Sequence, residues 1–425
     1  MKVQLLDDEI LEYLSLENQY KIFNFNLMQF LDQENMDYME GIQQLAIKKD
    51  EEINGIHGHN NLDYYDEGWF KWAGENALIT RGIPYPHRDD VEHGLLKETL
   101  RCWNMEIFNP QFDMAMGASV LGINPIAHHH NDRESLLSDL RDLLDGKKIA
   151  CIGITEPGRG SDAVNMTVKA DRGEDGSMTV NGIKCYTTNS PKADVCVVYA
   201  VTNPNDPRST MMQGVSHKEW DKGFKAERLG IPSVPKVHIG KTIFEDAYIP
   251  ADYVTGDEGE GYKILFEGLV PERIGIAASN IGQCWGAFTL AMLYANVRKQ
   301  FGEEILKHQA IGMSVLAKYY GRLSQATMAL IKLAEEYDRR VDQMPDDPLM
   351  NPYVAIASQM KESAALLVHE LTYECMHAMG GTGVTDQCKM PLYQGISEIA
   401  EVVGGTRNVQ LLIGSRTMRT MFRMV

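Results

Sequence analysis

The order of secondary-structure signals along this chain predicts an α+β fold in three parts: a helical domain, a compact β domain and a helical bundle. Segments such as LLKETLRCWNMEIF read as helices up to about residue 147. Strand-forming residues broken by turn dipeptides follow, and helical spacing returns beyond residue 258. The expected domains are therefore residues 1–147, 148–258 and 259–425.

The composition is that of an ordinary globular protein. Of the 425 residues, 44% are hydrophobic and 24% charged, which suffices for a large core. The first residues lack the pattern of a signal peptide, and no stretch approaches the roughly 18 apolar residues of a membrane span. We expect a cytoplasmic protein. The net charge of −18 argues against non-specific nucleic-acid binding, which needs a basic face.

Neither the cysteines nor the histidines form a metal-binding pattern. The seven cysteines are scattered and contain no CxxC pair, which favours buried free thiols in a reducing compartment. His128, His129 and His130 cannot all point the same way on a helix, so a solvated helix end is favoured over a metal site. No metal is expected.

Four segments rich in Val, Ile, Thr and Tyr read as strands of the β domain: residues 148–155, 177–188, 194–201 and 236–249. In the C-terminal part, apolar residues fall on one face of a predicted helix at spacings of three and four: Met360, Ala364, Leu367, Val368, Leu371 and Cys375. That face predicts a helix packed inside a bundle.

A glycine-rich turn follows the first predicted strand. Residues 153–162 (GITEPGRGSD) offer hydroxyl groups and backbone donors that suit a flat ring or a phosphate, although the composition alone also fits a surface turn. Together with the downstream strand 184–189 (KCYTTN), this turn resembles the flavin-binding β domain of the acyl-CoA dehydrogenases. That family shows a TEPxAGSD turn followed by a K-x-aromatic-[IT]-T-N strand.

The resemblance extends over roughly residues 150–415. Residues 246–262 look like the family's exit from the β domain into the first bundle helix. Residues 298–302 (RKQFG) look like the R-x-x-F-G segment, whose Arg meets the FAD pyrophosphate of a neighbouring subunit. Residues 380–383 (GGTG) look like the loop at the adenosine end of FAD, and residues 404–406 (GGT) stand at the family's spacing for its E-G-T motif. Each motif alone is weak, but five in this order are specific.

The resemblance implies the family's fold, cofactor and partners. The β domain would be barrel-like and the C-terminal part a four-helix bundle. The enzyme would be an FAD-dependent oxidoreductase acting on the CH–CH group of an acyl-CoA, as a homotetramer, with electron-transfer flavoprotein as its electron acceptor. The residues that would contact FAD are Ile154, Thr155, Gly160, Ser161, Tyr186, Thr188, Arg298, Gln300, Phe301, His377, Gly380, Gly381, Thr406 and Asn408.

The catalytic carboxylate usual in the family is missing. It is the Glu of E-G-T, and this chain has Gly404 there, which cannot abstract a proton. Either dehydrogenase activity is lost or another residue supplies the base. Residues 271–274 (PERI) resemble the pattern of isovaleryl- and long-chain acyl-CoA dehydrogenases, in which the Glu of an E-R pair is the base. Glu272 is therefore the candidate, although alone it reads as an exposed acid favoured by a helix dipole.

The chemistry implied by the resemblance needs one carboxylate and hydrogen-bond donors. A thioester α-proton leaves only when donors to the carbonyl stabilise the developing enolate, while the β-hydrogen departs as hydride to the flavin. In the family one donor is the backbone N–H at the acid position of E-G-T, so Gly404 keeps that role. Pro271 predicts Glu272 in a first helical turn, where the dipole stabilises its anion and burial raises its pKa.

The acyl pocket is expected along the predicted helix 112–121, where Asp113, Gly117 and Leu121 share a face. Ser161 and Arg273 complete the expected substrate contacts. The missing side chains of Gly117 and Gly404 favour a branched, cyclic or functionalised acyl group. Asp113 needs a partner, either in the protein, which we favour, or on the acyl group. Departures from the family pattern also favour an unusual acyl group; they occur at Arg159, Tyr186, His377 and residues 393–396.

Two other functions remain open. The first is a flavin-dependent monooxygenase or oxidase on the same fold. Monooxygenases also lack the E-G-T acid, but they need no α-proton base, so Glu272 argues against them. A non-catalytic flavoprotein or a nucleic-acid-associated relative is disfavoured by the negative charge. Residues 256–261 are not a Rossmann fingerprint, because no strand–helix unit with a ribose-binding acid frames their glycines.

Overall fold

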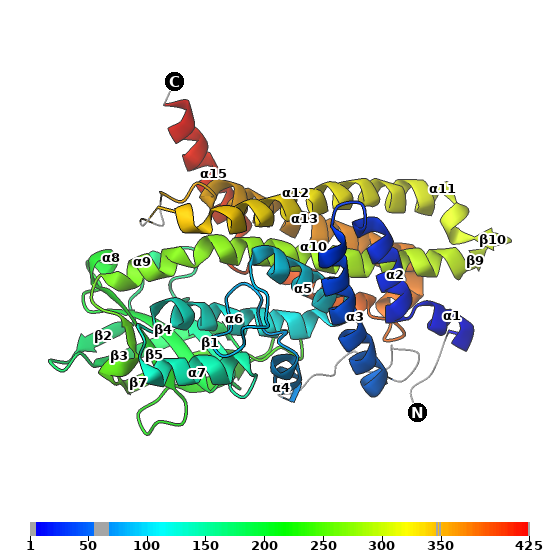
Figure 1. The fold of residues 1–425 in the computed structure, drawn as a ribbon. Helices are drawn as coiled ribbons and strands as arrows, with labels where there is room; N and C mark the ends of the chain where they lie inside the picture. Colours follow the sequence, from blue (N-terminus) through cyan, green and yellow to red (C-terminus); the bar gives the residue numbers. More distant parts are fainter. Residues whose placement is uncertain (1–5, 55–67, 346, 348–349, 424–425) are drawn as a thin grey trace.

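The computed structural model describes residues 6–54, 68–345, 347 and 350–423. Helices, strands and helices follow one another in the predicted order (Figure 1). No helix in these ranges is long and apolar enough to cross a bilayer. All seven cysteines are free and buried, as predicted.

The N-terminal part is helical. Its helices are α1 (Asp8–Tyr13), α2 (Leu16–Leu27), α3 (Gln33–Asn54), α4 (Gly68–Glu75), α5 (Leu95–Phe108), α6 (Pro110–His129) and α7 (Glu134–Leu144). The sequence sets the start of α6 locally, because Asn109 accepts a hydrogen bond from the Phe112 amide at 3.1 Å and Pro110 occupies the first turn. The helix ends in the three adjacent histidines, and His129 contacts Glu267 at 2.9 Å. No metal-binding cluster occurs among the described residues.

The β domain contains one eight-stranded mixed sheet. Its strands are β1 (Ala150–Gly153), β2 (Lys169–Arg172), β3 (Met178–Thr188), β4 (Val195–Val201), β5 (Met211–His217), β6 (Lys225–Leu229), β7 (Ile239–Ile249) and β8 (Val254–Gly256). The order is β6-β7-β3-β2-β4-β5-β8, with β1 paired in parallel to β4. The four predicted strands correspond to β1, β3, β4 and β7. The sequence signal missed β5 because MMQGVSH has neither alternation nor β-branched enrichment.

The C-terminal part is again helical. It comprises α9 (Glu260–Glu267), α10 (Leu269–Val297), α11 (Gln309–Ile311), α12 (Lys318–Arg340), α13 (Val354–Met379), α14 (Met390–Ala400) and α15 (Arg407–Phe422), after the short α8 (Pro207–Thr210) of the β domain. The strands β9 (Lys299–Gln300) and β10 (Glu303–Glu304) form a hairpin at the far end of α10 (Figure 1). The predicted apolar face of α13 is buried from Ala364 to Cys375, with Met360 half-buried. Helix α15 projects away from the other helices (Figure 1).

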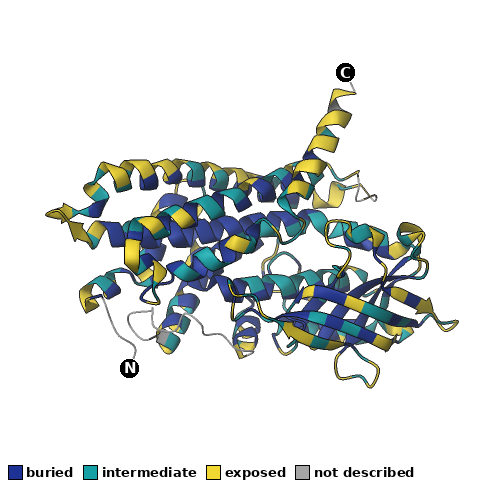
Figure 2. Ribbon diagram, turned by 180° about the vertical axis from the view of Figure 1, so that it is seen from behind, coloured by how far each residue is buried: buried dark blue, intermediate teal, exposed yellow. Residues whose placement is uncertain are grey.

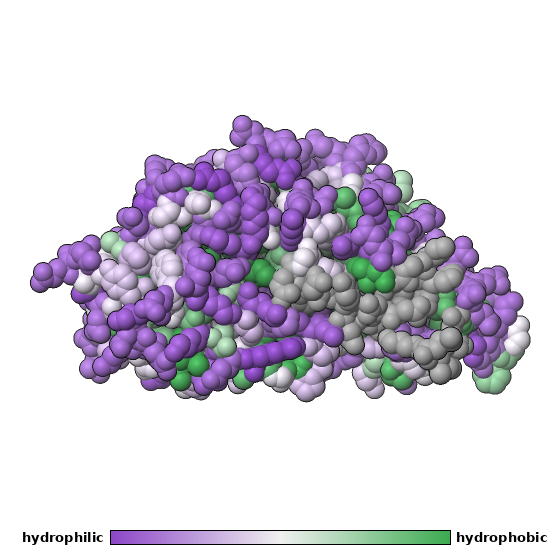
Figure 3. All heavy atoms as spheres, turned by 90° about the horizontal axis from the view of Figure 1, so that it is seen from below, coloured by the Kyte–Doolittle hydropathy of each residue, from purple (hydrophilic) through white to green (hydrophobic). Residues whose placement is uncertain are grey.

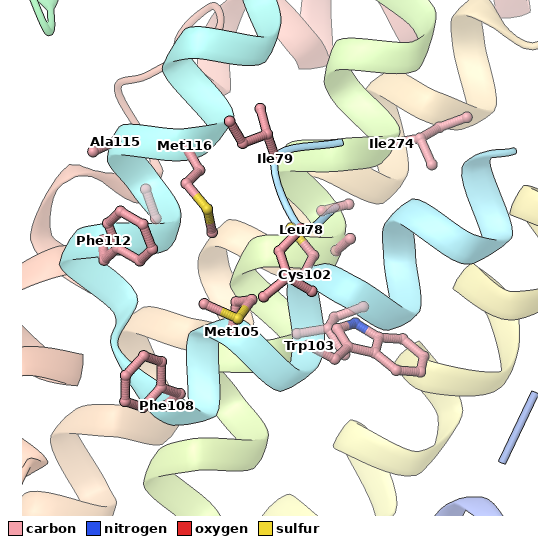
Figure 4. Packing of buried hydrophobic residues seen from close by; sticks show 14 of the residues in the cluster. Leu78, Ile79, Cys102, Trp103, Met105, Phe108, Phe112, Ala115, Met116 and Ile274 are labelled. Carbon is pink, nitrogen blue, oxygen red and sulfur yellow. The ribbon is translucent and has the colours of Figure 1, made fainter. Parts of the chain in front are cut away.

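A continuous core joins the helices to the sheet. Buried residues line the inner faces of the long helices, while exposed residues follow their outer faces (Figure 2). Between α5, α6 and α10, bulky side chains such as Trp103, Phe112 and Ile274 fill the space (Figure 4). The surface seen from below is mostly hydrophilic, as the charge of the chain leads one to expect (Figure 3).

Candidate active site

Glu272 and Gly404 lie against one another. A Cβ atom built on Gly404 would stand 3.1 Å from Glu272 Oε1 and 2.1 Å from the Cδ1 atom of Ile276. The backbone of Gly404 has φ +59°, a left-handed conformation that favours glycine. A longer residue at position 404 would therefore collide with the place that the Glu272 carboxylate occupies.

Burial makes Glu272 a stronger base than an exposed carboxylate. It lies in the first turn of α10, and Gly268 joins α9 to α10 with helical backbone angles, so the predicted helix start is a junction of two helices. Desolvation raises the pKa of Glu272, and the charges of Arg273 and Lys361 oppose that rise. The side chain of Arg273 is buried, and its Nε has no hydrogen-bond partner among the described residues.

Lys361 is a site residue that the sequence analysis missed. It lies on α13, is fully buried, and donates a hydrogen bond from Nζ to the Gly405 carbonyl oxygen at 2.7 Å. Burial lowers its pKa to about 8, and the neighbouring Glu272 opposes that shift. The signal that would have revealed it is a single Lys on the otherwise apolar inner face of a predicted helix.

The backbone N–H of Gly404 has no hydrogen-bond acceptor among the described residues. A carboxylate and a free N–H donor therefore stand side by side. Such a pair suits removal of a proton next to a carbonyl group, because the donor stabilises charge on the carbonyl oxygen while the carboxylate takes the proton.

The predicted flavin-binding turn leaves β1 at the edge of the sheet. Its residues Gly160 and Ser161 are exposed, and a Cβ built on Gly160 would meet no atom within 4 Å. A buried ion pair supports the turn from inside: Lys184 Nζ lies 2.9 Å from Glu156 Oε1 and donates to the Ile154 carbonyl oxygen at 3.0 Å. The rigid turn thus leaves its outer backbone free for a ligand.

Strand β3 presents Tyr186 beside this turn. Tyr186 has φ 54° and a side chain 68% exposed, an unusual conformation for an aromatic residue. The backbone N–H of the preceding Cys185 donates to the Thr155 carbonyl oxygen at 2.8 Å, which ties the strand to the turn. Thr188 is half-buried at the end of the same strand. An exposed ring held in this way is available to cover a bound ligand.

The other predicted FAD residues form a second group. Arg298, Gln300 and Phe301 belong to the hairpin beyond α10, where Phe301 is 96% exposed. The turn of Gly380 and Gly381 follows α13, and a 3.0 Å hydrogen bond between Tyr294 and Thr382 links it to the end of α10. His377 is exposed on the last turn of α13.

The two groups lie at opposite ends of α10. Glu272 is in its first turn and Arg298 follows its last residue, so they are about 40 Å apart at 1.5 Å per residue. That separation exceeds the span of a dinucleotide cofactor. Thr406 and the exposed Asn408, at the start of α15, follow Gly404 and belong to the end that carries Glu272.

The predicted acyl-pocket residues lie on α6, beside the expected substrate space between α6 and α10. Helix α6 runs antiparallel to the consecutive helices α9 and α10, because Asp113 pairs with Ser279 of α10 and His129, at the other end of α6, with Glu267, the last residue of α9. Gly117 and Leu121 are half-buried on the α6 side of this space, which we call the acyl slot. Asp113 is 1% exposed and lies 2.7 Å from Arg101 Nη1, so it finds its partner within the protein, the alternative that the sequence analysis favoured.

Comparison with known proteins identifies this architecture. The family model described as "Acyl-CoA dehydrogenase, middle domain" matches residues 151–247, and the one described as "Acyl-CoA dehydrogenase, C-terminal domain" matches residues 259–419. The short-chain-specific acyl-CoA dehydrogenase of Clostridium acetobutylicum is 30% identical over 296 residues, which cover 68% of this chain and 73% of that protein.

Solved structures share the fold across nearly the whole chain. The butyryl-CoA dehydrogenase of Megasphaera elsdenii superimposes with a TM-score of 0.81 at 22% identity, covering 91% of this chain and 98% of the other. PigA with FAD and proline (TM-score 0.80, 20% identity, 91% and 98% covered) and the prolyl acyl carrier protein oxidase AnaB (0.80, 19%, 91% and 99%) are equally similar. The predicted fold is thereby confirmed, and the chain belongs to the acyl-CoA dehydrogenase family, a family of FAD-dependent oxidoreductases.

Proposed function

We propose that this protein catalyses the FAD-dependent α,β-dehydrogenation of an acyl-CoA thioester, with Glu272 as the α-proton base. The observation that carries the proposal is the contact between the Glu272 carboxylate and Gly404, the position where the family's usual base would stand. The carboxylate of this chain reaches the same place from a different element.

Each residue around Glu272 has its own part in the proposed reaction. Glu272 accepts the α-proton, and its raised pKa strengthens it as a base. The free N–H of Gly404 donates to the thioester carbonyl oxygen and stabilises the charge that develops there. Arg273 and Lys361 keep positive charge near the carboxylate, so that it stays ionised despite its burial. FAD supplies the acceptor for the β-hydrogen, which leaves as hydride.

The chain has a surface that fits FAD. The turn carrying Ile154, Thr155, Gly160 and Ser161 has open space at Gly160, and Tyr186 stands exposed beside it. These residues would hold the flavin, and Ser161 and Arg273 would also contact the substrate. The roles of these residues remain predictions from the resemblance.

The FAD site is proposed to be shared between two copies of the chain. The group around Arg298 and Gly380 lies about 40 Å from Glu272, so it would complete the site of a neighbouring subunit. A homotetramer and an electron-transfer flavoprotein as electron acceptor are the corresponding partner proposals. The three domain bounds and the cytoplasmic location remain predictions from the sequence, as does the branched, cyclic or functionalised acyl group.

An oxidase is the second candidate, because the prolyl acyl carrier protein oxidase AnaB shares the fold. Both reactions would remove the α-proton with Glu272 and differ in what reoxidises the flavin. Mixing the reduced protein with air-saturated buffer separates them: an oxidase reoxidises within its turnover time, whereas a dehydrogenase reoxidises much more slowly.

The decisive experiment compares Glu272→Gln with Glu260→Gln, in which an exposed first-turn acid of α9 is replaced as a matched control. Anaerobic bleaching of the bound flavin by an acyl-CoA is followed by stopped-flow absorbance. We expect Glu272→Gln to retain the flavin and to slow bleaching about 10²–10⁴-fold, the usual value of a positioned base. The control should bleach at the wild-type rate. Near-normal bleaching in Glu272→Gln would remove Glu272 from the mechanism.

A further inference from the structure

The acyl slot is open along the line that leads away from Glu272. Residues Gly275, Ile276 and Ser279 follow Glu272 on α10 at helical spacing, and all are half-buried. A Cβ built on Gly275 or on Gly117 would meet no atom within 4 Å. Each of the two helices therefore has open space beside one glycine near the expected path from the base to Ser279.

A polar cluster closes the far end of this path. The hydroxyl of Ser279 donates to Glu106 and stands 3.3 Å from Asp113 Oδ2, so it lies between two carboxyl groups. Glu106 and Asp113 are each 1% exposed. Gln283, one turn beyond Ser279, is also buried and directs its amide toward Glu106 at 3.4 Å. The Oε1 atom of Gln283 has no hydrogen-bond partner among the described residues.

The charge of this cluster is negative. Three carboxyl groups, those of Glu98, Glu106 and Asp113, are buried in this region together with the guanidinium of Arg101. Arg101 pairs with two of them, since its Nε and Nη2 donate to Glu98 at 3.1 and 2.8 Å and its Nη1 donates to Asp113 at 2.7 Å. Burial and the neighbouring Asp113 raise the pKa of Glu106, which leaves one uncompensated carboxylate even when Glu106 is protonated.

Such an end does not suit a plain hydrocarbon chain or a terminal carboxylate. A methyl end would leave the free acceptors of Ser279 and Gln283 without partners, which costs free energy in a buried site. A carboxylate would meet negative charge, because the guanidinium of Arg101 is already paired with Glu98 and Asp113. A hydroxyl or ammonium group supplies the missing donors, and an ammonium group also balances the charge.

We propose that the acyl group dehydrogenated by this enzyme ends in a hydrogen-bond donor, a hydroxyl or a protonated amine, bound by Ser279 Oγ and Gln283 Oε1 beside Asp113. This assignment rests on the proposed function, because it takes Glu272 as the reacting end of the slot. Ser279 follows Glu272 by two helical turns, about 10 Å at 1.5 Å per residue. An extended chain covers about 3.5 Å per three bonds, so this length corresponds to about nine bonds. Because the contacts to Glu272 and to Ser279 occupy part of that length, the slot holds an acyl group of about six to eight carbons.

The test compares four acyl-CoAs of equal length on the flavin-loaded protein: hexanoyl-CoA, ω-hydroxyhexanoyl-CoA, ω-aminohexanoyl-CoA and adipoyl-CoA. Anaerobic flavin bleaching gives the rate constant and the apparent Kd for each. We expect the ω-hydroxy or ω-amino substrate to show a bleaching rate divided by Kd at least tenfold above that of hexanoyl-CoA, with adipoyl-CoA lowest. Hexanoyl-CoA or adipoyl-CoA in first place would overturn this assignment while the dehydrogenase function stands. Bleaching by none of the four, nor by longer or branched acyl-CoAs, would overturn the proposed function itself.

A variant connects the preference to the cluster. Ser279→Ala removes one acceptor and should abolish most of the tenfold preference, measured as the ratio of the two substrates' bleaching rates divided by Kd. Ser324→Ala, a half-buried serine of α12 away from the slot, is the matched control and should keep the preference. Calorimetric titration with ω-aminohexanoyl-CoA and hexanoyl-CoA gives a second readout that does not depend on turnover. An unchanged preference in Ser279→Ala by both readouts would contradict the assignment.

Discussion

Replacing Gly404 with alanine inserts a methyl group at the contact on which the proposed chemistry depends. Two costs can be worked out from the structure. Gly404 has a left-handed backbone with φ +59°, and a residue with a Cβ in that conformation lowers the stability of the fold by about 1–2 kcal/mol. The new Cβ would stand 2.1 Å from Ile276 Cδ1, and forcing this flexible side chain off its rotamer costs about 0.5–1.5 kcal/mol. We expect Gly404→Ala to lose about 1.5–3.5 kcal/mol of stability.

The same methyl group should also slow the reaction. It would lie 3.1 Å from Glu272 Oε1 and push the carboxylate away from its position beside the Gly404 N–H. A loss of about 1.4 kcal/mol of transition-state stabilisation slows bleaching tenfold, and we expect at least that. Thermal unfolding measures the stability change, and anaerobic stopped-flow bleaching measures the rate.

Two further variants distinguish the steric contribution from the backbone contribution to the stability loss of Gly404→Ala. Ile276→Val removes the Cδ1 atom, so the double variant with Gly404→Ala should regain the steric part of the stability loss and keep the backbone part. Gly321→Ala is the matched control, because a Cβ on this α12 residue would meet open space and its backbone is not left-handed. It should leave stability unchanged or raise it by about 0.5–1 kcal/mol. A Gly404→Ala protein as stable and as fast as the wild type would refute the reasoning.

Two other predictions concern Lys361 and the hairpin. The Lys361 pKa of about 8 lies below its ordinary value of 10.5, so between these pH values the unfolded chain holds more protons than the folded protein. The stability of the folded protein should therefore rise with pH across that range. Lys361→Met should lose this rise when unfolding midpoints are compared from pH 7 to 11. Because the charge of Lys361 lowers the pKa of Glu272, the acid limb of the pH–bleaching profile should move to higher pH in Lys361→Met. An acid limb at the wild-type pH would show that Lys361 does not affect the pKa of Glu272. Phe301→Ser should weaken subunit assembly and FAD retention together, measured by sedimentation and by the flavin-to-protein absorbance ratio, whereas Phe25→Ser, which replaces an exposed aromatic of α2, should change neither. A flavin-loaded wild-type monomer would contradict the shared site.

The features that the sequence determined are local. The order of helices, strands and helices follows from residue periodicity, because an amphipathic helix and a strand differ in period within a few turns. The turn at residues 153–162 could be placed after a strand because glycines and hydroxyl residues cluster there. The absence of the acid at Gly404 and the candidate base Glu272 could both be identified from sequence motifs at fixed positions in the chain.

The tertiary structure decided which of these residues come into contact. Glu272 and Gly404 meet only because α10 packs beside the segment that precedes α15, a contact between distant parts of the chain that no local period encodes. The same packing buries Lys361 next to them; its apolar helix face indicates burial, but no local pattern indicates which residues it meets. In the sequence, Asp113 is an acid on an otherwise apolar helix face, and only the fold identifies Arg101 and Ser279 as its partners. Long-range packing determines burial and charge pairing, and these set the chemistry of the site.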